Sequence, residues 1–351
     1  MARASHRGTT SPADGCVGDG RRPQVSPPRV RVTGVRVAAI DCGTNTIRLL
    51  VADVEPGERA VRDVVRTGTV TRLGQGVDRA GELAPDALAR TIDAAREFAG
   101  LVTEHGAERV RFVATSATRD ARNREDFVAG VRDALGVTPE VVTGQEEAAL
   151  SFAGVASGVA TGHPGPYLVV DLGGGSTELV LGQRAPEAAI SLDVGSVRLH
   201  ERHLHSDPPT EAEIEAATAD ARSAIDRAAA AVPFGRTATL VGVAGTITTV
   251  TARALDLPAY DRDRIDGAAL ATADVLAACD ALLRATQAER AAMPFLHPGR
   301  IDVIGAGALL WREIVTRVAA EVAGEGRSLD LVVTSERDIL DGIALGLAAR
   351  H

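Results

Sequence analysis

Two short stretches of this 351-residue chain repeat one pattern, and the repeat limits the folds open to it. Residues 40–51 are IDCGTNTIRLLV and residues 170–181 are VDLGGGSTELVL. In each copy an aspartate, Asp41 or Asp171, ends an apolar run; glycine and hydroxyl residues follow, and a second apolar run begins. Such a pattern is typical of two strands joined by a tight turn. Two copies predict a duplicated domain with a cleft between the halves.

The rest of the chain alternates between short apolar runs and stretches with helical spacing, which predicts an α/β sheet in each half. We expect a disordered tail over 1–34, a first domain over 35–163 and a second over 164–351, with a last helix that could pack back on the first domain. Predicted strands cover 36–42, 47–54, 61–72, 108–114, 167–171, 175–182, 188–193, 238–242 and about 329–333. Predicted helices cover 85–104, 124–135, 144–156, 195–204, 210–231 and a closing segment from about 337.

Composition excludes several classes of protein. The chain contains no lysine, so its 38 basic residues are all arginine, which excludes a P-loop and Schiff-base chemistry. A net charge of −9 argues against non-specific nucleic-acid binding. Cys16, Cys42 and Cys279 are too few and too scattered for a disulfide framework or a zinc site. No apolar run is long enough for a membrane span or a signal peptide, so we expect a cytoplasmic protein without membrane contact.

The repeated turn suits phosphate and a metal ion together. Glycine lets backbone N–H groups approach an anion closely, and hydroxyl groups add further donors. An aspartate beside such donors is unfavourable unless a divalent cation lies between the carboxylate and the phosphate, as Mg²⁺ does. The seventh residue after the aspartate is Arg48 in one copy and Glu178 in the other. We therefore expect one half to hold phosphate and the other to hold the metal.

Three further stretches carry candidate side chains. In TGQEEAALSFAGV, residues 143–155, Glu146 and Glu147 fall in the first turn of a helix. Either carboxylate could orient a water, or it could simply stabilise the N-terminus of the helix through the helix dipole. In ATSATRDARN, residues 114–123, Arg119 could bind phosphate, and Asn123 could cap the next helix. In LVGVAGTITTV, residues 240–250, Gly245 and Thr246 offer donors at a strand-to-helix junction.

Taken together, the stretches IDCGTNTIRLLV, VTRLGQG, ATSATRDARN, TGQEEA, VVDLGGGSTELVLG and VGVAGTI resemble the exopolyphosphatase / guanosine pentaphosphate phosphohydrolase (Ppx/GppA) family. The resemblance covers about residues 35–350. It implies duplicated actin-like ATPase (ribonuclease H-like) domains with an interdomain cleft, and metal-assisted hydrolysis of terminal phosphoanhydride bonds. It also implies Mg²⁺, with Mn²⁺ as an alternative, and inorganic polyphosphate or guanosine tetra- and pentaphosphate as partners.

The resemblance also assigns roles to individual residues. Glu147 matches the catalytic base, and Asp171 and Glu178 match carboxylates linked to the metal and the attacking water. Thr44 and Thr46 stand where the family commonly has serine. Arg72 falls on a shared motif without a definite role. The residues that match the phosphate-binding positions are Asp41, Gly43, Thr44, Asn45, Arg119, Gly173, Gly174, Gly175, Ser176, Gly245 and Thr246.

The chain resembles the short actinobacterial form of the family, since it lacks the C-terminal helical region and His-Asp signature of longer members. That predicts an exopolyphosphatase for shorter polyphosphates. The alternative within the family is a guanosine pentaphosphate 5′-phosphohydrolase. Alternatives of another class are an actin-like kinase and a non-catalytic polyphosphate or alarmone binding protein. A homodimer is compatible with the family, although no sequence feature indicates one.

Overall fold

The computed structural model describes residues 34–55, 60–158 and 162–349. The tail expected over residues 1–34 therefore lies outside the described residues, apart from Gly34. No helix in the described part of the chain is both long and apolar enough to span a membrane.

The first sheet has the strand order β3-β2-β1-β4-β5. β1, β2 and β3 are antiparallel neighbours, whereas β4 and β5 run parallel to β1. Its strands are β1 (Val35–Cys42), β2 (Thr46–Val54), β3 (Val61–Val70), β4 (Arg109–Ala114) and β5 (Glu140–Val141). The helices between them are α1 (Val77–Ala80), α2 (Pro85–Glu104), α3 (Ser116–Asp120) and α4 (Arg124–Leu135).

The second sheet repeats this topology, with the order β10-β11-β9-β6-β7-β8. β6, β7 and β8 are antiparallel neighbours, β9 and β11 run parallel to β6, and β10 adds an antiparallel edge. The strands are β6 (Tyr167–Leu172), β7 (Thr177–Gly182), β8 (Pro186–Leu192), β9 (Thr239–Val243), β10 (Ala269–Ala271) and β11 (Leu331–Thr334). The duplication that the two turns predicted is therefore present in the strand order itself.

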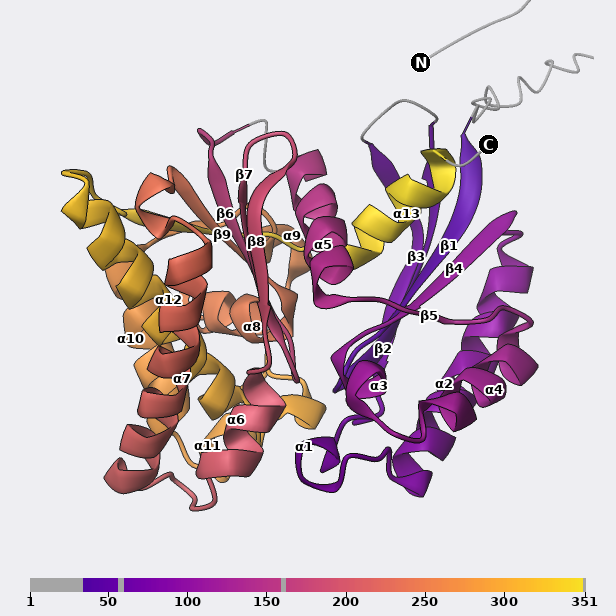
Figure 1. The fold of residues 1–351 in the computed structure, drawn as a ribbon, viewed down its shortest axis with the longest axis horizontal. Coiled ribbons are helices and arrows are strands. Elements are labelled where there is room, and N and C mark those ends of the chain that lie inside the picture. The colour runs from indigo at the N-terminus through magenta and orange to yellow at the C-terminus, as the bar shows by residue number, and fades with distance from the viewer. Residues whose placement is uncertain (1–33, 56–59, 159–161, 350–351) are drawn as a thin grey trace, which may run out of the picture. The chain divides into compact units, whose positions relative to one another are not determined.

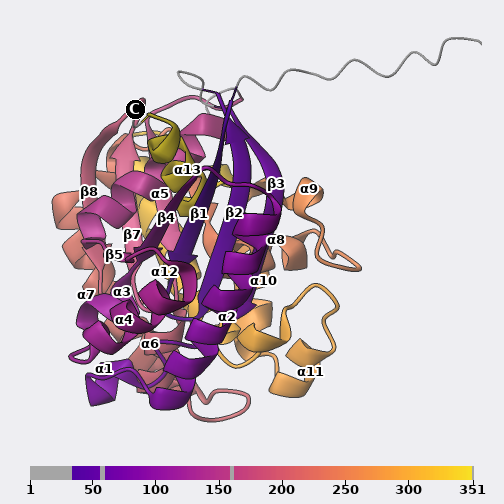
Figure 2. The same cartoon turned by 90° about the vertical axis from the view of Figure 1, so that its right-hand side faces the viewer.

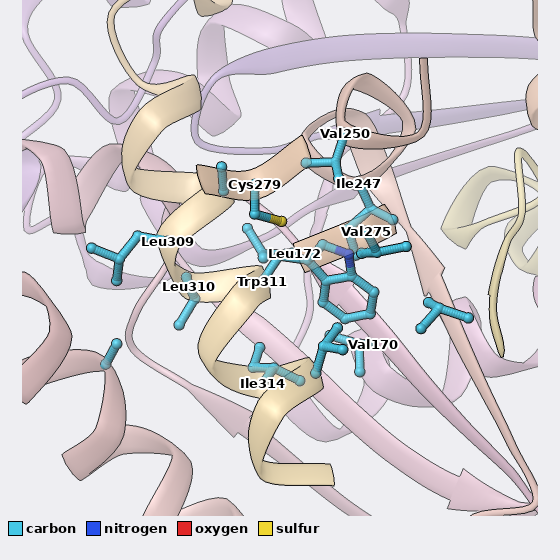
Figure 3. Close-up of a cluster of buried hydrophobic side chains, with 14 of the residues drawn as sticks. Val170, Leu172, Ile247, Val250, Val275, Cys279, Leu309, Leu310, Trp311 and Ile314 are labelled. Atoms are coloured by element: carbon cyan, nitrogen blue, oxygen red, sulfur yellow. The ribbon is translucent and has the colours of Figure 1, made fainter. Parts of the chain in front are cut away.

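Long helices cover the outer face of the second sheet and enclose an aliphatic core around Trp311 (Figure 3). Trp311 lies among Val170 and Leu172 of β6, Ile247 of α8 and Cys279 of α10. The helices of this half are α6 (Ser196–His203), α7 (Glu211–Ala231), α8 (Ala244–Ala254), α9 (Arg262–Ile265), α10 (Thr272–Arg284), α11 (Gln287–Ala291) and α12 (Ile304–Gly324), with 3-10 turns η2 (Phe234–Arg236) and η3 (Pro298–Arg300).

Two helices, α5 (Gly144–Gly158) and α13 (Ile339–Ala349), pack against each other between the two sheets (Figures 1 and 2). Side chains alternate across a strand, so β1 is buried on both faces: Ile40 meets the core under α2 and α4, whereas Ala39 meets α13. In the same way α5 covers the inner face of the second sheet. The last helix of the chain therefore completes the core of the first sheet.

The predicted duplicated α/β fold is confirmed, with small differences in detail. Sequence patterns missed β10 and the short helices α1 and α3, which are too short to show a period. Asn123 occupies the N-cap position of α4, as expected, but its side chain makes no capping hydrogen bond. The Asn123 side chain instead accepts from Leu83 N at 2.8 Å and donates to Leu83 O at 3.1 Å, so it ties α4 to the loop before α2.

Candidate active site

The two repeated turns meet at one cavity. Gly43 N donates to Thr46 O and Gly173 N donates to Ser176 O, each at 3.0 Å, so both turns have the same hydrogen bond. They also touch: a Cβ on Gly175 would lie 2.3 Å from Thr44 Oγ1 and 2.7 Å from Ser116 Oγ. Only glycine fits at this close approach. The cavity is lined by Asp41, Gly43, Thr44, Asn45, Thr46, Arg48, Thr115, Ser116, Glu147, Asp171, Leu172, Gly173, Gly174, Ser176, Ser196, Ala244, Gly245, Thr246, Arg300, Val303, Ile304 and Ile339.

In the first sheet the duplicated position is an ion pair. Asp41 and Arg48 are cross-strand partners, and Arg48 donates to Asp41 Oδ2 from Nε at 3.0 Å and from Nη2 at 2.6 Å. Arg48 Nη1 also donates to Asp338, which precedes α13. Burial disfavours the charged guanidinium, but Asp338 and Asp41 outweigh it and raise the pKa of Arg48 above its ordinary value. Two carboxylates therefore already neutralise Arg48.

In the second sheet the same position is a pair of carboxylates. Asp171 and Glu178 are cross-strand partners, 7% and 2% exposed. Burial raises the pKa of Asp171 to about 6, helped by the charge of Asp338 and opposed by a hydrogen bond from Ser151. Burial, Glu147 and Asp171 raise the pKa of Glu178 well above its ordinary value. Two carboxylates opposite each other repel, so this pair favours a shared proton or a cation.

Glu147 stands in the first turn of α5 and lines the cavity. Arg119 Nη1 donates to Glu147 Oε2 at 3.1 Å and to Val142 O at 3.2 Å. Burial raises the pKa of Glu147 to about 8, because desolvation and the charge of Asp171 outweigh Arg119. A carboxylate with a pKa near neutrality is suited to accept a proton from water.

The donor set on the second sheet fits Mg²⁺. All of the candidate donor atoms are oxygens, from Asp171 and its cross-strand partner Glu178 with Ser176 beside them, and buried paired carboxylates would gain from a cation. Mg²⁺ ordinarily takes one or two carboxylates and completes its shell with phosphate oxygens and water. Across the described ranges, no group of three or more His, Cys, Asp or Glu side chains is arranged to hold a metal ion.

The N-terminus of α8 closes another side of the cavity, with Gly245 and Thr246 at its wall. Arg300 lies against this turn, since a Cβ on Gly245 would be 2.2 Å from Arg300 Nη2. Burial lowers the pKa of Arg300, and the guanidinium has no ion pair or hydrogen bond with any residue that the structure describes. A partly buried cation without an ion pair, beside a helix N-terminus, favours an anion in the cavity.

Most of the predicted residues line this cavity, and three do not. Arg119 lies behind Glu147, Gly175 packs under Thr44, and Glu178 sits beside Asp171 with Ser191 Oγ donating to its Oε1 at 2.7 Å. Glu146 is exposed and accepts from Thr143 N at 2.9 Å, which supports its interpretation as a residue of the helix N-terminus. Arg72 is paired with Asp302.

Four further side chains lie in or beside the site without a role expected from the sequence. Ser116 Oγ is 2.8 Å from Thr44 Oγ1. Ser116 lies within the ATSATRDARN stretch, so its place in a stretch that already carried a candidate residue was the signal that could have identified it. Ser151 follows Glu147 by one helical turn and donates to Asp171 Oδ2. Arg300 and Asp338 stand in stretches without any local pattern. Only the tertiary fold brings Arg300 to the cavity and Asp338 to Arg48 at its edge.

Two sheets of one topology meet at glycine-rich turns around buried carboxylates and an arginine without an ion pair, an arrangement suited to a protein that acts on phosphate groups. Comparison with known proteins agrees. Residues 50–324 match the Ppx/GppA phosphatase family. The chain is 50% identical over 320 residues to "Exopolyphosphatase 2" of Mycobacterium tuberculosis, covering 89% of this chain and 98% of that protein.

Two further relatives agree with this match. A crystal structure titled as an exopolyphosphatase-like protein superposes with a TM-score of 0.86 and 48% identity, over 90% of this chain and 98% of that one. The "Guanosine-5'-triphosphate,3'-diphosphate pyrophosphatase" of Vibrio cholerae is 38% identical over 168 residues, 48% of this chain and 33% of that protein. The chain belongs to the Ppx/GppA phosphatase family and is a phosphohydrolase. Phosphatases of this family generally depend on a divalent metal ion.

Proposed function

We propose that the protein is an exopolyphosphatase, which releases the terminal phosphate of inorganic polyphosphate by attack of water. The observation that carries the proposal is the shape of one cavity wall. Glu147 and Asp171 line one side, with Glu178 behind Asp171 as its cross-strand partner, and the two turns, the α8 N-terminus and Arg300 supply positive partners for phosphate around them. The name of the half-identical mycobacterial relative supports this substrate.

The residues divide the work between binding and water activation. Backbone N–H groups of the two glycine-rich turns and the hydroxyls of Thr44, Ser116 and Ser176 would hold the terminal phosphate. Arg300 would bind the next phosphate and stabilise charge that develops on the leaving oxygen. Glu147 would orient a water in line with the leaving group and accept its proton, while Arg119 holds the Glu147 carboxylate in place.

Asp171 and Glu178 would hold Mg²⁺, or Mn²⁺, which when bound neutralises phosphate charge and polarises the reacting phosphorus. The raised pKa of both carboxyl groups supports this role, since a cation at the pair would relieve their repulsion.

Short polyphosphate is the proposed form of the substrate. Among the arginines that line the cavity and its neighbour, Arg48 and Arg66 are already paired with Asp338 and Asp341, which leaves Arg300 for the substrate. Glu336 and Asp338 line the neighbouring cavity and would repel a long polyanion. A few phosphate units therefore fit the available charge better than a long chain does.

The second candidate is hydrolysis of the 5′ terminal phosphate of guanosine pentaphosphate. A cavity of about 510 Å³ adjoins the phosphate cavity and shares Arg300 with it. Tyr260, Phe295 and Leu296 line this second cavity, and such apolar and aromatic surface suits a nucleoside base better than bare polyphosphate. The name of the Vibrio cholerae relative is in keeping with this substrate.

Parallel assays test the two candidates. Phosphate release is measured with Mg²⁺ from short polyphosphate, long polyphosphate, guanosine pentaphosphate and ATP. We expect the highest kcat/KM with short polyphosphate. Faster turnover of long chains would contradict the short-chain proposal, and release from guanosine pentaphosphate alone would favour the second candidate. No release from any of the four by folded protein would indicate a binding role.

A further inference from the structure

Ser151 of α5 makes a hydrogen bond that is unusual for a hydroxyl on a helix. Serine and threonine in a helix commonly donate to a carbonyl three or four residues earlier. Thr91 donates to Ala87 O, and Ser157 donates to Gly154 O in the same way. Ser151 is fully buried, and its Oγ donates instead to Asp171 Oδ2 on β6.

This bond joins two parts of the site. Ser151 lies one helical turn after Glu147, so the two side chains share one face of α5. Asp171 Oδ2 accepts from Ser151, whereas Oδ1 has no hydrogen bond to any described residue and remains available to the cavity that Asp171 lines. The hydroxyl therefore fixes which carboxylate oxygen is free, and it ties the helix of Glu147 to the strand of Asp171.

The packing of α5 makes the position of Ser151 rigid. A Cβ on Gly154 would lie 1.9 Å from Asp338 O, and a Cβ on Gly342 would lie 2.0 Å from Leu150 O, so α5 and α13 are in direct backbone contact next to Ser151. The helix has no room to move toward α13, and Ser151 holds its other side against β6.

We propose that Ser151 is a positioning residue, which orients Asp171 for the metal ion and sets the distance between Asp171 and Glu147. This inference rests on the proposed function, because it assumes that Asp171 takes part in binding the metal. Partners that hydrogen-bond a ligating side chain typically change metal affinity or activity by about 10- to 100-fold when they are removed.

Ser151→Ala removes the hydroxyl and adds no volume, and Ser157→Ala on the same helix is the matched control. Mn²⁺ binding to the substrate-free protein is measured by electron paramagnetic resonance, together with the Mg²⁺ concentration for half-maximal phosphate release. We expect Ser151→Ala to raise the Kd for Mn²⁺ and the half-maximal Mg²⁺ concentration by about 10- to 100-fold, with the polyphosphate KM at saturating Mg²⁺ nearly unchanged. Ser157→Ala should stay within about twofold of wild type, because its hydroxyl bonds only to its own helix.

If Ser151→Ala does not fold, Ser151→Cys keeps a weak donor of similar size and should weaken Mn²⁺ binding in the same direction. If a folded Ser151 variant bound Mn²⁺ as tightly as wild type, the positioning role of Ser151 would be overturned and the proposed function would stand. A wild-type protein that binds Mn²⁺ but releases no phosphate from any substrate would overturn the proposed function alone. A wild-type protein that binds no Mn²⁺ would overturn both.

Discussion

Asp171 on β6 and Glu178 on β7 are direct cross-strand neighbours, at the positions that Asp41 and Arg48 occupy in the first sheet. In the first sheet the two side chains of the pair attract each other, and in the second sheet the two carboxylates repel each other. The duplicated scaffold has thus produced two different electrostatic environments from one backbone pattern. The first half is neutralised internally by Arg48, whereas the second half would gain stability from an added cation.

Glu147→Gln should abolish most turnover and leave substrate binding intact. Glutamine keeps the size of the side chain and an acceptor for Arg119, but it cannot take a proton from water. We expect kcat to fall by about 10²- to 10⁴-fold, with little change in the Kd of short polyphosphate by calorimetry. Glu146→Gln is the matched control and should keep near-wild-type kcat, because Glu146 is exposed and bonds to Thr143. Lost binding in Glu147→Gln would make Glu147 a structural residue or a metal ligand.

The raised pKa of Glu147 predicts how stability depends on pH in the metal-free protein. The folded state holds this proton up to about pH 8, whereas the unfolded chain releases it near the ordinary value of 4.5. The folded state binds more protons in this window, so the free energy of unfolding falls as pH rises through it. Glu147→Gln removes that loss and should be more stable than wild type by roughly 1–3 kcal/mol at pH 9.

Urea unfolding in EDTA at pH 5, 7 and 9 measures this effect. The difference between Glu147→Gln and wild type should be smallest at pH 5 and should grow toward pH 9. Asp171 contributes in the same direction over a lower window, since its pKa is about 6. A difference that stays constant with pH would show that Glu147 titrates normally.

Arg300→Met should separate stability from binding. The substitution removes a partly buried cation that has no ion pair or hydrogen bond among the described residues, so the free protein should be as stable as wild type or more stable. Binding of short polyphosphate should weaken by about 10- to 100-fold, since a hydrogen bond to a charged group contributes about 1.5–3 kcal/mol.

Arg66→Met provides the contrast. Arg66 lines the neighbouring cavity too, but it is paired with Asp63 and Asp341, and Asp341 is almost fully buried. Its removal leaves a buried carboxylate uncompensated and should lower the free energy of unfolding by about 3 kcal/mol. If Arg300→Met were the less stable of the two variants in thermal unfolding, Arg300 would be a structural residue.

The sequence predicted those parts of the site that have a local pattern. A strand followed by Asp, Gly and hydroxyl residues can adopt few conformations, so the turns at Asp41 and Asp171 could be recognised and assigned to one cavity. Glu147 could be placed in the first helical turn because its neighbours have helical spacing. Both features depend on residues that are close in sequence, so the sequence pattern is enough to predict them.

Arg300 and Asp338 could not be predicted, because their roles depend on chain segments far apart in sequence. Arg48 meets Asp338 across 290 positions, and no spacing rule connects them. Arg119 shows the opposite problem: its motif suggested phosphate, whereas its guanidinium is bonded to Glu147 and Val142 O. A local pattern selects a residue, and the tertiary fold decides its partner.

Gly154→Ala tests whether the contact between α5 and α13 is essential to the fold. Alanine ordinarily stabilises a helix relative to glycine by about 1 kcal/mol. At Gly154, however, the new Cβ would lie 1.9 Å from the backbone oxygen of Asp338, and backbone cannot move aside as a flexible side chain can. We expect Gly154→Ala to destabilise the protein by about 1–3 kcal/mol and to lower kcat, because α5 carries Glu147 and Ser151. The measurement is thermal unfolding, and Gly100→Ala in α2 is the control. Nothing lies within 4 Å of the added Cβ at Gly100, so this variant should be neutral or stabilising. Equal behaviour of the two variants would mean that α5 and α13 can separate without loss, and the rigid placement of Ser151 would lose its support.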